Sequence, residues 1–453
     1  MKILIVGCGK VGKNIAEELI QEDHDIVLVD SNSSVVQELS NSLDVLGVIG
    51  DAASLTTLKD AGVEKSDVLL AMTSSDEINM LCCLFARKAN PKIKTIARVR
   101  NPIYSREINY IKDDLGLTLI INPEMATARE IARLLRFPQA MEVQHFSRGR
   151  VELTSFVVPN ENVIANKKVM DVAKIFNFKI LFVGIERKDE VIVPHGDTLL
   201  LPNDKVSIIG KPSEVSAFFS YAGLLQNPIK SVMICGGSTI AYYLASMLIK
   251  SKIDVTIIER DKEKCEQLAE LIPEANIING DATEHSLLIE EGFESVDAFI
   301  SLTNVDEENI MLSLYAGSAT SAKVITKVNH IELDSVMNKL NVGSLVYPKH
   351  ITSDNIITYV RGLSNAALSS NITALYRILD NKAEAMTFKI VKESELTSKN
   401  LMDLRIIDNL LVCAIIRDDE VIIPSGQDQI QVGDIVLIAT TNKGIENIEE
   451  IVK

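Results

Sequence analysis

The sequence predicts an α/β protein with two doubly wound parallel-sheet domains, each followed by a small α+β domain. Apolar strand-like runs alternate with helix-like stretches over residues 1–122, which is typical of a parallel sheet covered by helices on both faces. Residues 140–224 instead carry paired apolar runs around a polar turn, as in a β-hairpin. The second half of the chain then repeats this order.

Six short, continuously apolar runs predict six strands in the first domain. They are KILIV (2–6), DIVLVD (25–30), DVLGVIG (44–50), DVLLAM (67–72), TIARVR (95–100) and LTLII (117–121). Connecting helices are expected at 11–21, 33–42, 54–61, 76–89 and 103–114. An amphipathic helix is predicted over 123–138, because apolar residues recur there on one face.

The small domain is predicted to combine strands with two helices. VELTSFVV (151–158) indicates a strand and KKVMDVAKIF (167–176) a helix. The runs KILFVGIE and EVIVP flank the polar turn RKDE, which favours a hairpin. KVSIIG (205–210) adds a strand before a final helix.

The whole chain reads as a duplication of this two-domain unit. Gly7 and Gly236 lie 229 positions apart, and LLAMTSSDEINM (69–80) matches FISLTNVDEENI (299–310). The small domains match over 186–210 and 416–440. We therefore expect domains at 1–122, 140–224, 228–347 and 367–453, and a second long helix at 348–366. The region 366–383 carries no strong secondary-structure signal.

The loop GCGKVG (7–12) lies between a strand and a helix, which predicts a Rossmann-like dinucleotide site. Gly7 permits the tight turn, Gly9 lets the backbone approach a pyrophosphate, and Gly12 lets the helix pack closely. The helix N-terminus offers unpaired amides and a favourable dipole to phosphates. Asp30 would accept hydrogen bonds from ribose hydroxyls and repel a 2′-phosphate, so NAD is favoured over NADP.

Further binding residues are expected at later strand ends, because ligands of open parallel sheets bind at the carboxyl edge. Asp51, Thr73 and Arg98 each lie at or just after a predicted strand. Two alternatives stay open: Thr73 as the N-cap of the next helix, and Arg98 as a partner in a surface salt bridge.

The second copy of the loop reads GGSTIA and departs from the fingerprint. Ser238 adds a side chain where a pyrophosphate approaches most closely, whereas Ala241 in the third glycine position is tolerated. Glu259 keeps the acid, and the Arg260 that follows it could attract phosphate. We expect this site to bind a nucleotide, either a different one or more weakly.

Composition excludes several classes of function. A formal net charge of −16 argues against a nucleic-acid binder. No stretch approaches the ~20 apolar residues of a membrane span, and the N-terminus has no signal-peptide pattern. The six cysteines show neither CxxC nor metal spacing, so we expect reduced thiols in the cytoplasm. We expect no catalytic residues and no metal site.

This order of motifs resembles the tandem RCK family, whose domains regulate potassium conductance. The resemblance is carried by the duplicated glycine loop, the acidic strand end, GDA at 50–52, the threonine after the fourth strand and EVIVPHGDT (190–198). It covers essentially the whole chain.

The resemblance implies Rossmann-like RCK N-terminal domains that pair through the helices at 123–138 and 348–366, and RCK C-terminal domains that add dimer contacts. It implies a homo-oligomeric, tetrameric gating ring on the cytoplasmic side of the membrane, bound to a potassium-translocating subunit of the TrkH or TrkG type. NAD(H), and ATP or ADP in some members, would change the ring's shape. The acidic charge suits the basic cytoplasmic loops of such a partner.

The resemblance also implies which residues bind ligand. In the first half these are Gly7, Cys8, Gly9, Lys10, Val11 and Gly12 at the phosphates, Asp30 at the ribose, and Asp51, Ala52, Thr73, Ser74 and Arg98 around them. In the second half they are Gly236, Gly237, Ser238, Thr239, Ile240, Glu259, Asp281, Thr303 and Lys327.

Two alternatives belong to other classes of function. An NAD-dependent oxidoreductase would need an acid or base from the second domain, and only His195 is a candidate there. An RCK regulator of another cation transporter, such as a cation/proton exchanger, stays open because the transporter's identity lies in the partner.

Overall fold

The computed structural model describes residues 1–22, 24–136, 140–146, 149–176, 179–188, 190–224, 229–329, 340, 342–368, 372–379, 382–418, 420–442, 445 and 447–453. The chain divides into two compact units. The first contains Met1–Ile131 and Ser231–Ile357, and the second contains Ala132–Lys230 and Thr358–Lys453.

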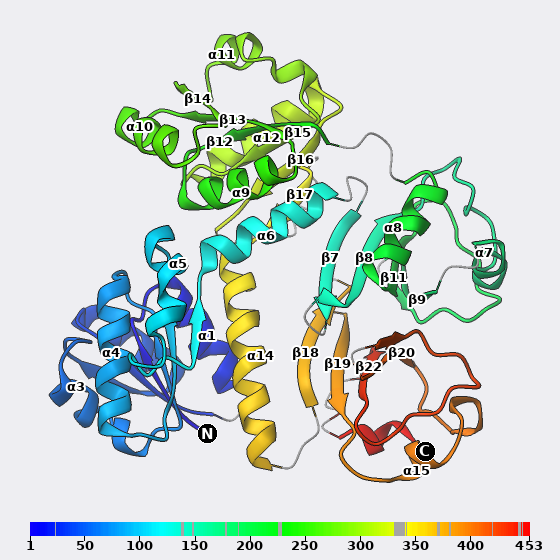
Figure 1. The fold of residues 1–453 in the computed structure, drawn as a ribbon, viewed down its shortest axis with the longest axis horizontal. Coiled ribbons are helices and arrows are strands. Elements are labelled where there is room, and N and C mark those ends of the chain that lie inside the picture. The colour runs from blue at the N-terminus through cyan, green and yellow to red at the C-terminus, as the bar shows by residue number, and fades with distance from the viewer. Residues whose placement is uncertain are drawn as a thin grey trace. The chain divides into compact units, whose positions relative to one another are not determined.

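The first unit contains the first predicted parallel sheet, with strand order β3-β2-β1-β4-β5-β6. Every neighbouring pair in this sheet is parallel, and the sheet lies between α1 and α4 (Figure 1). Its elements are β1 (Lys2–Val6), α1 (Lys10–Ile20), β2 (Asp25–Asp30), α2 (Ser33–Leu43), β3 (Leu46–Ile49), α3 (Leu55–Asp60), η1 (Val63–Lys65), β4 (Val68–Ala71), α4 (Asp76–Ala89), β5 (Lys94–Arg98), α5 (Pro102–Ile111), β6 (Leu119–Ile121) and α6 (Pro123–Arg136).

The second parallel sheet of this unit repeats the same strand order, β14-β13-β12-β15-β16-β17. A helix equivalent to α5 was also expected before β17, but residues 330–339 and 341 lie outside the described part of the chain. The described elements are β12 (Ser231–Cys235), α9 (Thr239–Lys250), β13 (Asp254–Glu259), α10 (Lys262–Leu271), β14 (Asn276–Asn279), α11 (His285–Glu290), η3 (Phe293–Ser295), β15 (Ala298–Ser301), α12 (Asp306–Ala319), β16 (Lys323–Lys327), β17 (Ser344–Val346) and α14 (Pro348–Leu368).

Hydrogen bonds join the two halves of this first unit. The Nδ2 of Asn14 on α1 donates to the Oγ of Ser353 on α14 at 2.7 Å. The Nδ2 of Asn122, just before α6, donates to the hydroxyl of Tyr243 on α9 at 2.9 Å. Each long helix therefore contacts the Rossmann-like domain from the other half of the sequence, and Figure 1 shows α14 beside α1.

The second unit contains two five-stranded sheets, with orders β10-β9-β11-β8-β7 and β18-β19-β22-β20-β21. Their strand pairs are antiparallel, and the hairpin predicted around RKDE is β9 with β10. The elements are β7 (Ala140–Phe146), β8 (Val151–Val157), α7 (Val169–Phe176), β9 (Ile180–Arg187), β10 (Glu190–Ile192), β11 (Lys205–Gly210), α8 (Pro212–Tyr221), β18 (Ile372–Ile378), β19 (Ala383–Lys389), α15 (Glu395–Ser398), η4 (Leu401–Asp403), β20 (Leu410–Arg417), β21 (Glu420–Ile422), β22 (Ile435–Thr440) and η5 (Ile448–Ile451).

Strands β7 and β18 were not predicted from the sequence, and tertiary packing explains why they form. Both sheets contribute to one apolar core, in which Phe146 and Tyr376 pack edge to face with ring centroids 4.6 Å apart. A Cβ on Gly184 of β9 would stand 2.5 Å from Leu379, so the sheets approach closely there. Apolar area supplied by the other sheet stabilises strands whose own sequences are weakly patterned.

The two small domains are not identical, which corrects the expectation that the second repeats the first throughout. The segment equivalent to α7 is only the 3-10 turn η4, and residues equivalent to the end of α8 form the 3-10 turn η5. Both domains nevertheless keep an ion pair between a partly exposed arginine and a buried aspartate. Arg187 donates to Asp204 through Nε at 2.8 Å and Nη2 at 2.7 Å. Arg417 bonds Asp434 in the same way.

Among the described residues, no helix is long and apolar enough to cross a membrane. All six cysteines are free thiols and buried.

Candidate nucleotide-binding sites

The first glycine loop has the geometry that its three glycines predict. Gly7 has φ +97°, and a Cβ there would stand 2.6 Å from the backbone nitrogen of Thr73. A Cβ on Gly12 would stand 2.1 Å from the carbonyl oxygen of Gly7, so α1 packs directly against the loop. At Gly9, by contrast, the described residues place no atom within 4 Å of such a Cβ. The loop is therefore closed by protein at its first and third glycines and open at its second.

The N-terminus of α1 faces this open position. Gly9 is the N-cap of the helix and has no side chain with which to accept from the first-turn amides. Lys10 is exposed and Val11 half-buried in that first turn. Uncapped amides at a helix N-terminus favour a phosphate group.

Asp30 lies at the end of β2, as predicted, and also fixes the glycine loop. The backbone amide of Cys8 donates to its Oδ2 at 2.7 Å, and that of Asn32 donates to its Oδ1 at 2.9 Å. Each carboxylate oxygen can accept a further hydrogen bond, so contact with a ribose is compatible with this geometry. Burial raises the pKa of the Cys8 thiol to about 12, and this side chain is no candidate nucleophile.

Asp51 and Ala52 form the turn after β3. The Oδ1 of Asp51 accepts from the backbone amide of Ala53 at 2.8 Å, and Asp51 is exposed. Ala52 is buried under the turn. Only the carboxylate of this pair is accessible to a ligand.

Thr73 and Arg98 are brought together by Asn79, a buried residue of α4 that sequence reasoning missed. The amide and hydroxyl of Thr73 both donate to the Oδ1 of Asn79, at 2.9 and 2.7 Å. The Nδ2 of Asn79 donates to the carbonyl of Arg98 at 2.9 Å. The N-cap of α4 is Ser75 rather than Thr73, so that alternative is wrong. Asn309 occupies the same place in the second copy, and this repetition was the available signal.

Arg98 is not a surface ion-pair residue. Its Nη2 donates to the carbonyl of Thr73 at 2.8 Å, and its buried Nε has no hydrogen-bond partner among the described residues. Burial lowers the pKa of Arg98. A half-buried cation whose Nε donor has no partner among the described residues suits an anionic ligand.

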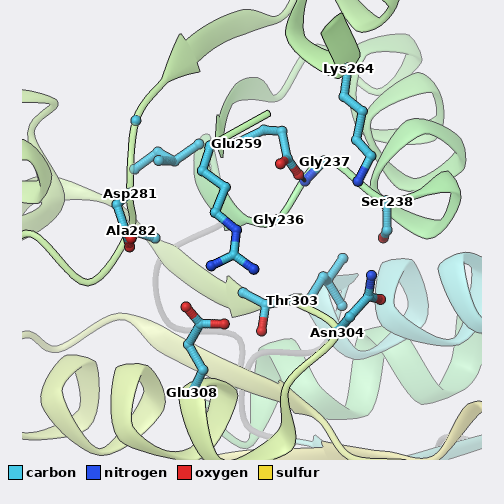
Figure 2. Close-up of a pocket in the computed structure, with 14 residues that line it drawn as sticks. Gly236, Gly237, Ser238, Glu259, Lys264, Asp281, Ala282, Thr303, Asn304 and Glu308 are labelled. Carbon is cyan, nitrogen blue, oxygen red and sulfur yellow. Dashed lines mark hydrogen bonds between the residues drawn. The ribbon is translucent and has the colours of Figure 1, made fainter. Parts of the chain in front are cut away.

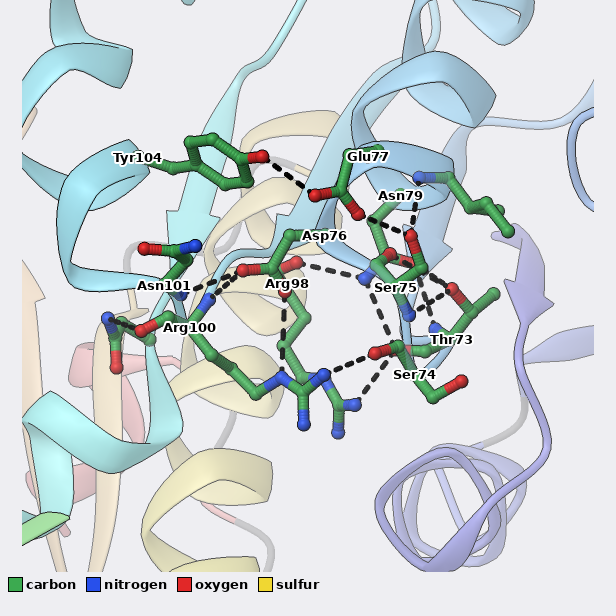
Figure 3. A network of polar contacts seen from close by, with 12 residues as sticks. Thr73, Ser74, Ser75, Asp76, Glu77, Asn79, Arg98, Arg100, Asn101 and Tyr104 are labelled. Carbon is green, nitrogen blue, oxygen red and sulfur yellow. Dashed lines mark hydrogen bonds and ion pairs between the residues drawn. The ribbon is translucent and has the colours of Figure 1, made fainter. Parts of the chain in front are cut away.

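A charged network lies around Ser74 (Figure 3). Asp76 accepts from the backbone amides of Arg100 and Asn101, each at 2.8 Å, and Arg100 also donates to the carbonyl of Ser74. These residues line a pocket together with Glu124 of α6 and Thr239 of α9. Thr239, predicted for the second site, therefore lies at a pocket of the first one.

The second glycine loop keeps the turn but not the open helix end. Gly236 has φ +104°. Ser238 is the N-cap of α9, and its side chain accepts from the amide of Ala241 at 3.4 Å. Glu259 repeats the role of Asp30, because Gly237 donates to its Oε2 at 2.7 Å and Asp261 to its Oε1 at 2.9 Å. The acid is conserved between the copies, while the phosphate end has changed.

A pocket opens over this second loop (Figure 2). Of the predicted residues, it is lined by Gly236, Gly237, Ser238, Glu259, Asp281 and Thr303. Hydrogen bonds from the amide and hydroxyl of Thr283 lower the pKa of Asp281. The pocket is also lined by Arg260, which was expected to attract phosphate, and by three polar residues that were not predicted, Lys264, Asn304 and Glu308.

Ile240 and Lys327 do not line this pocket. Ile240 is buried in α9. The Nζ of Lys327 donates to the carbonyl of Leu302 at 3.4 Å, and burial lowers its pKa. Like the half-buried Arg98, the buried Lys327 is a cation that donates to a backbone carbonyl next to the glycine loop.

Known families match the chain in the order that the duplication predicts. The TrkA-N domain matches residues 3–123 and 232–348, and the TrkA-C domain matches residues 153–223 and 385–453.

Curated relatives match over the full length. The Trk system potassium uptake protein TrkA homolog of Archaeoglobus fulgidus is 32% identical over 452 residues, covering 100% of both chains. The Trk system potassium uptake protein TrkA of Haemophilus influenzae is 31% identical over 456 residues, covering 100% of this chain and 98% of the relative.

Solved structures share the fold. The GsuK RCK domain aligns with a TM-score of 0.63 at 17% identity, over 98% of this chain and 92% of that one. A GsuK channel bound to NAD aligns with a TM-score of 0.65 at 18% identity, over 99% of this chain and 78% of that one. The predicted resemblance to RCK proteins is confirmed, and the chain belongs to the family of Trk system potassium uptake proteins TrkA, with its TrkA-N and TrkA-C domains each present twice.

Proposed function

We propose that this protein is a nucleotide-binding regulatory subunit of a potassium uptake system and is not an enzyme. NAD(H) binds at the first glycine loop, and a nucleotide, ATP or ADP among the candidates, binds at the second. Ligand binding changes the shape of a cytoplasmic homo-oligomeric ring, and the ring controls a membrane potassium-translocating subunit of the TrkH or TrkG type.

One observation carries the nucleotide part of this proposal. The first loop combines an uncapped helix start at Gly9, empty space above it, and Asp30 held at the ribose position. These are the parts that a Rossmann site uses for the pyrophosphate and the ribose. The GsuK channel with the same fold was solved bound to NAD, which supports the choice of ligand class.

The arrangement of charges between the two sites supports regulation. Glu124 of α6 has a buried Oε2 with no hydrogen-bond partner among the described residues. Burial lowers the pKa of both Arg98 and Lys327, and Glu124 opposes that shift at each of them. One carboxylate therefore interacts with both Arg98 of the first half and Lys327 of the second. If a bound phosphate paired with Arg98, the charge of Glu124 would act mainly on Lys327. Ligand binding at the first site would thereby change the electrostatic environment of the second site and couple the two.

A bound nucleotide shifts the equilibrium between two conformations of the ring only to the extent that it binds one conformation more tightly than the other. No chemistry on the nucleotide is required. We place a tetrameric ring against a membrane partner because related proteins are named as potassium uptake proteins. The net charge of −16 suits basic cytoplasmic loops; unchanged partner affinity and salt dependence after charge reversal of the acidic clusters would contradict that contact.

Calorimetric titration of NADH, NAD, ATP and ADP into the full-length protein tests the binding sites. We expect Asp30→Ala to weaken NADH selectively and Glu259→Ala to weaken only the second ligand. If neither substitution weakens any ligand, the site assignment is wrong. Steady hydride transfer with mixed substrates would instead favour the oxidoreductase, for which His195, exposed in the loop after β10, was the candidate.

Potassium flux through liposomes carrying the cognate membrane subunit tests the regulatory role. We expect NADH to change the flux with the wild-type protein and not with Asp30→Ala. A response only with a cation/proton exchanger would assign the ring to that other transporter.

A further inference from the structure

The two nucleotide pockets differ in their basic residues. Arg260 and Lys264 line the second pocket. At the equivalent offset of 229 positions, the first copy has Ser31 and Val35. The second site has thus acquired two positive charges within five residues of its acidic strand end.

One of these charges, Arg260, lies next to the strand end that would face a bound adenosine ribose. In dinucleotide-binding folds the acid at the end of the second strand faces the ribose hydroxyls, and a neighbouring arginine accommodates a 2′-phosphate. Arg260 directly follows Glu259, the last residue of β13. Lys264 lies in the first turn of α10, and Figure 2 shows its side chain directed toward Gly237 and Ser238.

The acids of the pocket accept hydrogen bonds from the protein, and the charge of Arg260 also helps to lower the pKa of Asp281. Glu259 is only 9% exposed, and each of its oxygens accepts from a backbone amide. Asp281 accepts twice from Thr283. No described residue forms an ion pair with Arg260 or Lys264, although both belong to a pocket. The remaining acid is Glu308, which also lines the pocket and replaces Ile78 of the first copy.

The helix start at the glycine loop of the second site offers one fewer free amide than that of the first site. Ser238 satisfies one first-turn amide of α9 with its own side chain, whereas α1 begins at Gly9 without a cap.

We propose, on the basis of the proposed function, that the second site binds an adenosine nucleotide with a phosphate on its ribose. Arg260 and Lys264 would hold this phosphate, and their two positive charges would offset the repulsion by Glu259, which Asp30 exerts without such neighbours at the first site. The 2′-phosphate of NADP(H) and the 3′-phosphate of coenzyme A share this chemistry. The first site, with Asp30 and no basic neighbour at positions 31 and 35, prefers the unphosphorylated ribose of NAD(H).

Calorimetry on the full-length protein tests this directly. The probes are NADP, NAD, adenosine 2′,5′-bisphosphate and adenosine 3′,5′-bisphosphate. We expect one bisphosphate isomer, and its parent cofactor, to bind one site per chain at least tenfold more tightly than NAD binds that site. The preferred isomer distinguishes the NADP type from the coenzyme A type, and either supports the proposal.

Matched variants exchange the two pockets. Arg260→Ser with Lys264→Val copies the first site and should weaken the preferred bisphosphate at least tenfold, while NADH affinity at the first site stays unchanged. The reciprocal Ser31→Arg with Val35→Lys should improve bisphosphate binding at the first site. Glu308→Ile should strengthen binding at the second site by removing an opposing charge.

Two results would overturn the proposal. One is that neither bisphosphate binds more tightly than NAD to the wild-type protein. The other is that the Arg260→Ser/Lys264→Val protein, with an unchanged thermal transition, binds the bisphosphate as the wild type does. If NADH still binds in an Asp30-dependent way, only this inference fails; if NADH binds nowhere, the proposed function fails with it.

Discussion

Replacing Gly9 by serine should separate nucleotide affinity from fold stability. The substitution gives the first loop the residue that the second loop has at Ser238. Gly9 has φ −66° and ψ −173°, which any residue adopts, and its Cβ would meet no described atom within 4 Å. The ligand-free protein therefore accommodates the new side chain without strain.

The size of both effects follows from the second site. The Oγ of Ser238 accepts from the amide of Ala241, so a serine at position 9 should accept from the amide of Gly12. Serine is a better N-cap than glycine by about 0.3 kcal/mol, and stability should rise by no more than that. A phosphate loses one hydrogen bond, for which about 1.5–3 kcal/mol is typical when one partner is charged. NADH affinity should therefore fall about 10- to 150-fold.

Urea unfolding and NADH calorimetry on the same samples measure the two quantities. Ser238→Gly is the matched control, since it should lower stability slightly and strengthen ligand binding at the second site. If Gly9→Ser binds NADH as the wild type does, the phosphates do not lie at this helix end and the reasoning is refuted. A loss of stability above 1 kcal/mol, well beyond the value of about 0.3 kcal/mol for an N-cap exchange, would contradict the open geometry at Gly9.

Three further substitutions have effects that the structure sets. Gly12→Ala places a Cβ 2.1 Å from the carbonyl oxygen of Gly7; overpacking costs about 1–3 kcal/mol, so both the urea midpoint and NADH affinity should fall, and an unchanged midpoint would contradict the close contact. Arg187→Ala leaves the carboxylate of Asp204, 2% exposed, without its bidentate partner; because the arginine is itself partly exposed, we expect a loss of about 2–3 kcal/mol in urea unfolding, which Arg187→Lys should not fully restore. Burial raises the pKa of Glu124, so the folded protein binds this proton more tightly than the unfolded chain does, and wild-type stability should fall as pH rises from about 4.5 through the raised pKa. Glu124→Gln should remove that pH dependence. If the difference in unfolding free energy between the wild type and Glu124→Gln does not change with pH, the raised pKa of Glu124 is contradicted.

Much of the fold could be predicted because it depends on local pattern. Continuously apolar runs between helical segments specify a buried parallel sheet wherever they occur, and the duplication showed that the pattern occurs twice. Gly7 and Gly12 were assigned correctly for a similar reason. Their roles follow from the turn between β1 and α1, which involves only neighbouring residues and the strand beside them.

The roles of individual site residues could be predicted only in part. The sequence predicted that Asp30 and Glu259 lie at strand ends. It did not predict that Asp30 accepts a hydrogen bond from the backbone amide of Cys8, or Glu259 one from that of Gly237. Asn79 went unrecognised because its partners lie on two other strand ends.

The sequence by itself determined that there are two glycine-loop domains and two small domains, and that the second loop differs at Ser238. Only the tertiary structure decided that this serine caps α9, that Arg260 and Lys264 share a pocket, and that β7 and β18 form strands. It also decided that the carboxylate of Glu124 acts electrostatically on both Arg98 and Lys327. The physical reason is the same in each case: these properties depend on hydrogen bonds, charges and apolar surface supplied by segments far away in the sequence, which no local pattern encodes.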